Sequence, residues 1–502
     1  MPHRSALFLA VILALWTAAN VRAQLPTSTA QPSAGTISKD HRDRALGILD
    51  GISKGIQELY YDPKMHGLDW NAVLATARSK IARSNSLNEA LTQVAVAVSA
   101  LNDSHTVFEP PARPYHLDFG VEYQLIWNRC FVMRVRPGSD AEVQGLKRGA
   151  EVLTINGLSP NRQNFFNIQY LAYTLDPKPE MHLEVRYRSG EEQDLRIKAK
   201  VSMSPDLAYR PGGGVRYDVI RSSEDVFHRM RPRIAQFGDV SVIRLPWFYY
   251  PAPHFYSTPD ARDQFFDIPD KIHKDKAVII DLRGNHGGSV DTLKDFVGMF
   301  FDHDVKLYDE VERRKTSREV AKGQHHRYFP GQVIVLVDSE SASAAEIFAR
   351  VMQLEKRATV VGDHTSGSVM EATDYYYASS GVDYGVEISV ANLIMTDGKS
   401  LEHLGVNPDE ILLPKLADLE SGSDPVLSHA AQELGVTLSP DDAGRVSPTS
   451  GPKTSAAASA AAVKMRVMTK CRDTEIPNNR NTVGEISVAP FGFCGRGLSV
   501  TA

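Results

Sequence analysis

Hydrophobic positions change their spacing along this chain of 502 residues, and the changes divide it into three parts. Residues 40–115 carry apolar side chains three and four positions apart, which is typical of amphipathic helices and predicts a helical module. Over residues 116–202 the pattern becomes short apolar runs between turn residues, which predicts a small β domain. Residues 203–420 alternate β-branched runs with helical spacing, which predicts an α/β region built on a mostly parallel sheet.

Both ends of the chain lack this patterning. A basic start, an apolar run and the small-x-small site Val21-Arg22-Ala23 predict a secretory signal peptide over residues 1–23, followed by a linker over 24–39. The apolar run of about 13 residues is shorter than the roughly 20 that span a bilayer, so cleavage is favoured over a stable membrane anchor. Residues 421–502, rich in Ser, Pro, Gly and Ala, are predicted to be a low-complexity, disordered tail. We therefore expect an exported protein, periplasmic or extracellular.

Composition narrows the classes of function. The 56 Lys and Arg against 61 Asp and Glu give a net charge of -5, which leaves no basic field for nucleic acid. The 3 cysteines include no Cys-x-x-Cys pair, so neither a disulfide scaffold nor a cysteine zinc site is predicted, and we expect no metal and no cofactor. Cys471 and Cys494 lie close enough in sequence to pair after export, which leaves Cys130 single. The oligomeric state is not predicted.

The first of two chemically interesting turns is Asp-Leu-Arg-Gly-Asn-His-Gly-Gly over residues 281–288. It joins an apolar strand to a helix, where the amides of Gly287 and Gly288 are placed to bind an anion or a developing oxyanion. A Walker loop needs Gly-Lys-Ser/Thr after the glycines, and Ser289-Val290 stands there instead. Phosphoryl transfer is therefore not predicted.

The second turn, over residues 338–346, again passes from a strand to a helix. Ser343 lies at the start of that helix, where its hydroxyl can attack a carbonyl carbon while the Ala344 amide binds the resulting oxyanion. The same spacing also fits a turn whose serines only cap the helix. Spacing alone leaves both interpretations open.

Five motifs occur in the order in which the C-terminal processing, or tail-specific, peptidases carry them. They are Asp103-Ser104-His105-Thr106, the glycine turn, Ser341-Ala342-Ser343, Val361-Gly362-Asp363 and Gly405-Val406-Asn407-Pro408-Asp409. The chain resembles this family over residues 40–420. The resemblance implies a crotonase-like α/β peptidase core with an N-terminal helical module and an inserted PDZ-like β domain. It also implies that Ser343 is the nucleophile of a serine-type peptidase.

The β domain resembles a PDZ domain between Gly145 and Gly157. In that family a sheet edge accepts an extended peptide as an added strand, and backbone amides capture its terminal carboxylate. Phe119, Gly120 and Val121 occupy the position of the capturing loop. The implied partners are the C-terminal segments of peptides or unfolded proteins. A small β domain with Asn-Gly turns and no peptide to bind is the alternative.

Ser368 stands where the typical family member carries its catalytic lysine. A serine cannot take the proton of Ser343, so another base is needed. The nisin-resistance type of family member is similar to this chain, because there a histidine of the helical module pairs with the serine. His105 occupies that position and is predicted to be the general base, with His286 and His364 as alternatives.

Three charged residues complete the predicted site. Glu346, one helical turn after the nucleophile, is predicted to orient the histidine or to stabilise its charged form. We expect Asp103 to close a turn rather than to act as the catalytic acid, and Arg283 to anchor the glycine turn.

Together these residues predict an exported serine endopeptidase that captures C-terminal segments and cleaves through an acyl-enzyme on Ser343. Two alternatives come from other classes of protein. One is a catalytically inactive PDZ-bearing scaffold that has lost the lysine. The other is a binding module for apolar ligands.

Overall fold

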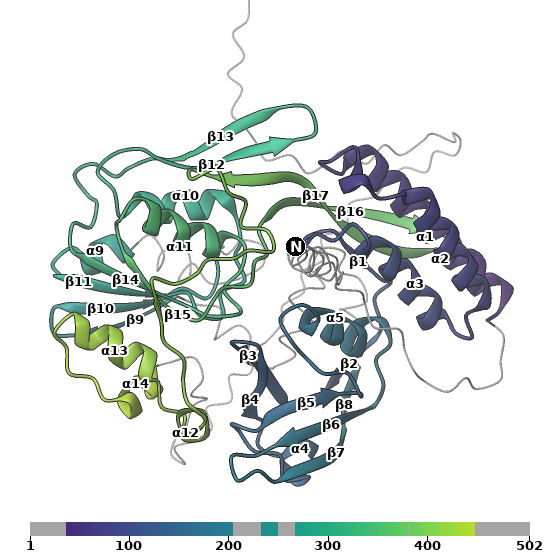
Figure 1. The fold of residues 1–502 in the computed structure, drawn as a ribbon, viewed down its shortest axis with the longest axis horizontal. Coiled ribbons are helices and arrows are strands. Elements are labelled where there is room, and N and C mark those ends of the chain that lie inside the picture. Colours follow the sequence, from purple (N-terminus) through teal and green to yellow (C-terminus); the bar gives the residue numbers. More distant parts are fainter. Residues whose placement is uncertain (1–36, 204–231, 249–266, 380, 447–502) are drawn as a thin grey trace, which may run out of the picture. The chain divides into compact units, whose positions relative to one another are not determined.

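The computed structural model describes residues 37–203, 232–248, 267–379 and 381–446 (Figure 1). The predicted signal peptide and the cysteine pair Cys471 and Cys494 lie outside the described residues, and Cys130 is buried with a free thiol. Among the helices of the described ranges, none has the length and apolar character needed to cross a membrane.

Three helices form the N-terminal module, as the spacing of its apolar residues predicts. Each helix follows a residue whose side chain accepts a hydrogen bond from a first-turn amide, which satisfies one of the otherwise unpaired N–H groups. Their apolar faces meet in one buried cluster. The helices are α1 (Lys39–Leu59), α2 (Trp70–Arg83) and α3 (Leu87–Ser99), with the 3₁₀ turn η1 (Met65–Gly67) between the first two.

A five-stranded antiparallel sheet in the order β3-β4-β5-β6-β7 forms the β domain. Side chains alternate between buried and more exposed along β6 and β7, so one face of the sheet covers an apolar cluster of its own. The strands are β3 (Val121–Ile126), β4 (Arg129–Val135), β5 (Glu151–Ile155), β6 (Glu180–Arg186) and β7 (Glu192–Lys198). The same stretch holds α4 (Asp140–Val143), α5 (Phe165–Gln169), the π-helix η2 (Tyr170–Leu175) and the strand pair β2 (Tyr115–Asp118) and β8 (Lys200–Met203).

The α/β core is built on a six-stranded sheet in the order β18-β15-β14-β11-β10-β9. Neighbouring strands from β10 to β18 are parallel, and β9 pairs antiparallel with β10. This agrees with the parallel sheet that the buried β-branched runs predict. The strands are β9 (Arg233–Phe237), β10 (Val240–Arg244), β11 (Ala277–Asp281), β14 (Gln332–Val337), β15 (Thr359–Gly362) and β18 (Glu410–Ile411).

Helices cover both faces of this sheet (Figure 1). On one face an apolar cluster joins the sheet to α9 (Ile268–Ile272), α10 (Val290–Gly298) and α11 (Ala344–Leu354). On the other face a second cluster joins it to α13 (Pro425–Glu433) and α14 (Pro440–Val446). A short helix, α12 (Leu416–Ser421), leads from the last strand to α13.

The prediction of a disordered tail from residue 421 is wrong for residues 421–446. Small apolar residues of α13 and α14, among them Ala430, Ala431 and Ala443, are buried against the outer face of the sheet. The small side chains of these three alanines allow close helix–sheet packing, and alanines in an unpatterned segment do not by themselves indicate a helix. Residues 447–502 lie outside the described ranges.

A second sheet, not predicted from the sequence, links the helical module to the core. Its long strand β17 pairs with β1, β12 and β16, all antiparallel. Tyr384, Val386 and Ile388 of β17 belong to the same buried cluster as α1 and α3. The helical module therefore shares its apolar core with this sheet. The strands are β1 (Val107–Glu109), β12 (Val305–Glu312), β13 (Thr316–Ala321), β16 (Met370–Ser379) and β17 (Val382–Met395).

Candidate active site

Ser343 occupies a strained turn between β14 and α11. Its backbone has φ 55° and ψ -121°, a conformation that a residue with a side chain adopts at a cost of about 1–3 kcal/mol. Such a strand-to-helix turn holds a serine hydroxyl out of the strand and beside the first amide of the helix, as the nucleophile turn of α/β-hydrolases does. The surrounding residues are buried, while Ser343 itself remains partly exposed.

The glycine turn after β11 packs directly against this serine. Gly287 has φ 98°, and a Cβ atom there would lie 2.6 Å from the Cβ of Ser343 and 3.0 Å from the nitrogen of Ala344. Gly288 has φ 144°, and a Cβ atom there would lie 2.3 Å from the carbonyl oxygen of Phe248. Both positions therefore require glycine, and the structure brings the two predicted turns together.

The amides of these turns differ in what they bind. Gly287 donates its N–H to Oδ1 of Asn285 at 2.8 Å, so this amide is already used within the turn. Within the described ranges, no acceptor is bonded to the N–H of Gly288 or of Ala344. Of the three amides that the sequence predicts for an oxyanion hole, the geometry therefore favours Gly288 and Ala344.

Arg283 anchors the glycine turn, as predicted. Its guanidinium bonds both oxygens of Asp281 at 2.8 and 2.9 Å and both oxygens of Asp424 at 3.0 and 2.7 Å. Burial opposes the charge of the guanidinium, but the two carboxylates outweigh it and raise the pKa of Arg283. The N-terminus of α13, where Asp424 is the cap, is thereby fixed to the turn.

Glu346 is fully buried and accepts four hydrogen bonds. The donors are the amides of Ser343, Gly367 and Ser368 at 3.1, 2.7 and 2.9 Å and the hydroxyl of Thr365 at 2.6 Å. Burial raises the pKa of Glu346 to about 7, against the lowering effect of these bonds. These donors, rather than a histidine, surround the carboxylate, so Glu346 holds the 365–368 loop against the start of α11.

Ser368 lies beside Ser343. Its carbonyl accepts the Ser343 amide at 2.9 Å, and its hydroxyl accepts a hydrogen bond from Ser366 at 3.1 Å. The residue at the predicted position of the lysine therefore meets the predicted nucleophile through its backbone carbonyl, and its side chain carries no basic group.

His105 is buried in the loop between α3 and β1. Asp103 closes this loop by accepting the amides of His105 and Thr106 at 3.0 and 2.6 Å, as predicted. The His105 Nδ1 atom lies 2.8 Å from the hydroxyl of Ser104, and that hydroxyl donates to Oε2 of Glu402 at 2.8 Å. A histidine, a hydroxyl and a carboxylate thus form one hydrogen-bonded line.

Glu402 ties this line to the loop behind the nucleophile. Its oxygens also accept the amides of Ser104 at 2.7 Å and of Val369 at 2.9 Å, and Val369 directly follows Ser368. Burial raises the pKa of Glu402. Nothing in the sequence marks Glu402 as part of the site, because it belongs to none of the five motifs and meets Ser104 only in the folded chain.

The two alternative histidines have other surroundings. The His364 Nδ1 atom lies 2.8 Å from the backbone carbonyl of Thr365. The ring of His286 packs against Trp247, with ring centres 5.8 Å apart. His105, by contrast with these surroundings, is joined to the buried carboxylate of Glu402 through the Ser104 hydroxyl.

Comparisons with known proteins find similar sequences and a similar fold. The profile of peptidase family S41 matches residues 239–412, which hold both turns and Glu402. A carboxyl-terminal-processing protease of Synechocystis is 31% identical over 318 residues, and the carboxy-terminal processing protease CtpA of Bacillus subtilis is 25% identical over 287 residues. Residues 239–412 thus carry a peptidase family S41 domain, and the chain resembles the C-terminal processing peptidases.

The matches to these family members are partial. They cover 61% of this chain and 65% of the Synechocystis protein, and 56% of this chain and 53% of the Bacillus protein. The fold is similar to that of mature CPAF, with a TM-score of 0.58 at 16% identity over 76% of this chain and 96% of that one. Both turns and the sheet that carries them thus lie in a known mixed α/β fold.

In this chain, the predicted carboxylate-capturing loop of the β domain is closed. Gly120 has a positive φ and donates its amide to Oδ1 of Asp118 at 2.8 Å, while Asp118 forms an ion pair with Arg136. Phe119 is buried and packs edge-on against Tyr173, with ring centres 5.7 Å apart. A peptide carboxylate would have to displace Asp118 to reach the Gly120 amide.

The edge strand β3 of the β domain contacts the turn that carries the nucleophile. Gln124 donates to Oδ2 of Asp338 at 2.6 Å, and the hydroxyl of Ser339 donates to the carbonyl of Leu125. The other oxygen of Asp338 accepts the amides of Gly284 and Glu340, each at 3.0 Å. One carboxylate thus holds the glycine turn, the serine turn and the β domain together.

Proposed function

We propose that this chain is an exported serine endopeptidase that cleaves peptide bonds through an acyl-enzyme on Ser343. The observation that carries the proposal is the strained Ser343 turn, packed on the glycine turn and joined through the 368–369 segment to Glu402, Ser104 and His105. A strained serine turn is costly to fold, and a helix cap alone does not need it. Export rests on the predicted signal peptide.

In the proposed mechanism His105 takes the proton of Ser343 as Oγ bonds to the carbonyl carbon of the substrate. The amides of Gly288 and Ala344 bind the oxyanion that forms. The C–N bond then breaks, and His105 returns the proton to the leaving amine. Water, deprotonated by the same histidine, hydrolyses the ester and frees Ser343.

Glu402 takes the place of the triad carboxylate in this proposal, acting on His105 through the Ser104 hydroxyl. Glu346 becomes a positioning residue, because its oxygens hold the amides of Ser343 and Ser368. The absence of a lysine at position 368 is then no loss of function, since the proton goes to the histidine.

The β domain supplies the substrate in this proposal. As in PDZ domains, β3 would accept an extended C-terminal segment as an added strand once its contacts with Asp338 and Ser339 have opened, and residues 119–121 would bind the carboxylate once Asp118 has moved. Substrates are therefore peptides or unfolded proteins with a free C-terminus.

The test compares the purified chain with Ser343→Ala, His105→Ala, His286→Ala and His364→Ala on one peptide with a free and with an amidated C-terminus. Loss of the nucleophile or the base is expected to lower kcat by about 10⁴-fold or more, and the other two histidine variants should keep activity. Amidation should raise KM. Equal residual hydrolysis by all five proteins would contradict the proposal and favour the inactive scaffold. Loss of activity in His286→Ala or His364→Ala, with His105→Ala active, would make that histidine the general base.

A further inference from the structure

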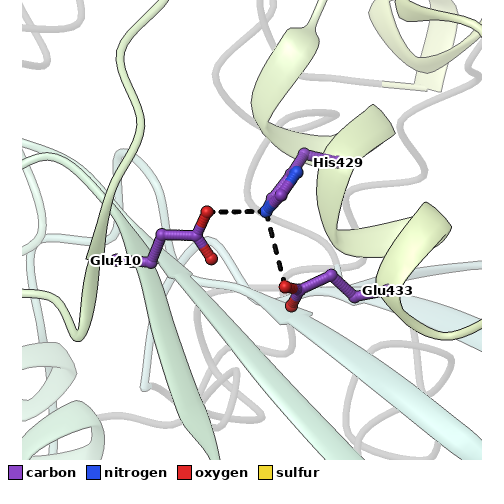
Figure 2. Close-up of side chains that lie close together, drawn as sticks. All are labelled: Glu410, His429 and Glu433. Atoms are coloured by element: carbon purple, nitrogen blue, oxygen red, sulfur yellow. Dashed lines mark ion pairs between the residues drawn. The ribbon is translucent and has the colours of Figure 1, made fainter.

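Three side chains capable of binding a metal meet on the outer face of the core sheet, away from both catalytic turns. Figure 2 shows Glu410 of β18 facing His429 and Glu433, which lie one helical turn apart on α13. One nitrogen of the histidine and one oxygen of each carboxylate lie within 4.8 Å of one another. This group contains no cysteine, so the cysteine spacing in the sequence gives no sign of it.

The contacts at the histidine indicate a ligand rather than a plain ion pair. Its Nε2 atom lies 2.8 Å from Oε1 of Glu410 and 3.6 Å from Oε1 of Glu433. The Nε2 atom is itself buried, yet within the described ranges it forms no hydrogen bond. Neither carboxylate is therefore in line with an N–H, and both oxygens flank the nitrogen. A cation between the three atoms would satisfy the nitrogen and both oxygens together.

We propose that Glu410, His429 and Glu433 form a binding site for one divalent ion of the zinc class. One imidazole nitrogen and two carboxylate oxygens are ligands that Zn²⁺ accepts, and small movements would bring them to the bond lengths of about 2.0–2.2 Å that it requires. Two carboxylates neutralise the charge of the ion. A water molecule completes four-fold coordination, because the three side chains remain one-third or more exposed at 39%, 33% and 40%.

The place of the site in the fold gives the ion a structural role. β18 is the edge strand of the sheet, paired with β15, and α13 crosses the neighbouring face. The cap of α13, Asp424, binds Arg283 of the glycine turn. An ion bound by Glu410, His429 and Glu433 therefore fixes the C-terminal half of α13, and the N-cap of this helix, Asp424, supports the candidate active site. The proposal does not depend on peptidase activity.

Metal binding to the full chain, stripped with a chelator, tests the proposal by calorimetric titration with Zn²⁺ and by the visible absorption of Co²⁺. His429→Ala and Glu433→Gln each remove one ligand. His182→Ala is the matched control, because His182 is a partly exposed histidine, like His429, that also forms an ion pair with a carboxylate, Asp194. Both affinity and the thermal midpoint with and without Zn²⁺ are measured.

One equivalent of Zn²⁺ is expected to bind and to raise the thermal midpoint in the unchanged chain and in His182→Ala. Loss of an outer-shell partner weakens metal sites about 10–100-fold, so loss of a direct ligand should weaken this one at least as much. Co²⁺ should show the intense visible bands of four-fold coordination. Stoichiometry and affinity that are the same in all variants would overturn the proposal, as would a midpoint that Zn²⁺ does not change.

Discussion

Glu402 is linked to His105 through the hydroxyl of Ser104. Replacing Glu402 therefore tests the proposed chemistry most directly. In Glu402→Gln the Ser104 hydroxyl loses its charged acceptor, so the histidine loses the group that stabilises its protonated form. We expect kcat to fall about 10²–10⁴-fold with little change in KM. Steady-state kinetics on a peptide measure the two separately.

Ser104→Ala removes the connecting hydroxyl but leaves the charge of Glu402 in place, and should give a smaller fall in kcat. Glu355→Gln, an exposed change at the end of α11, is the control. A fall in kcat/KM that came wholly from KM in Glu402→Gln would contradict the proposed role and indicate a part in substrate binding.

Glu346 makes a prediction about pH and stability. Burial raises its pKa from 4.5 to about 7, so the folded state holds the proton more tightly than the unfolded state does. This favourable contribution is complete below pH 4.5 and is lost as pH rises through about 7. Gln does not titrate, so the stability difference between the unchanged chain and Glu346→Gln should shrink by up to about 3 kcal/mol from pH 4.5 to 8.

Urea unfolding at four pH values between 4.5 and 8 measures this difference. Glu355→Gln, at the exposed C-cap of the same helix, should give a difference that does not depend on pH. If the difference for Glu346→Gln grew as pH rose, the carboxylate would be stabilised by its four hydrogen bonds more than it is destabilised by burial.

Single residues also mark the limit of prediction from sequence. Ser343, Gly287 and Arg283 could be found because each belongs to a short motif whose chemistry is local. Glu402 could not, because 298 positions separate it from Ser104, and a lone glutamate in a loop carries no pattern. The bond from Gly287 to Asn285 was equally hidden, since it depends on the conformation of the turn.

At the scale of elements, we predict that hydrolysis requires the close approach of the two strand-to-helix turns. Gly287→Ala places a Cβ atom 2.6 Å from that of Ser343, at φ 98°. We expect loss of hydrolysis by at least about 10²-fold because the turns must move apart, with the sheet itself intact. Peptide hydrolysis and far-ultraviolet circular dichroism together check this.

Gly398→Ala is the matched control. Gly398 also has a positive φ, 79°, but nothing lies within 4 Å of the added Cβ atom. It should share the backbone strain of about 1 kcal/mol without the loss of activity. Equal activity of the two variants would show that the glycine turn does not have to lie against the nucleophile.

Elements were predictable where burial produced a pattern. The parallel sheet that holds β10, β11, β14 and β15 was predictable, because strands buried on both faces are continuous β-branched runs. The helices α13 and α14 were not, because short alanine-containing segments show a helix only once the surface they cover is known. The pairing of β17 with β1 could not be predicted either, because about 280 residues separate the partners and neither strand carries a pattern that names the other.

At the scale of the whole molecule, a largely buried ion pair joins the β domain to the core. Arg162 of the β domain forms an ion pair with Asp363 at 2.9 Å, and both side chains are largely buried. A double-mutant cycle on Arg162→Met and Asp363→Asn should give a coupling free energy of about 1–3 kcal/mol in urea unfolding.

The exposed pair Arg186 and Glu192, within the β domain, is the comparison and should give about 0–1 kcal/mol. A coupling near zero between Arg162 and Asp363 would mean that the two parts separate in solution. The contact of Gln124 with Asp338 would then form only part of the time.

The sharing of one apolar core between the N-terminal helices and β17 has a consequence for the order in which the chain is made. The faces of α1 and α3 that meet Tyr384, Val386 and Ile388 are synthesised first, and their cover is synthesised roughly 300 residues later. At about 5–20 residues per second, these helices wait roughly 15–60 seconds with an uncovered apolar face. The N-terminal helices therefore complete their apolar core only after β17 has been made, which couples their folding to that of the second sheet.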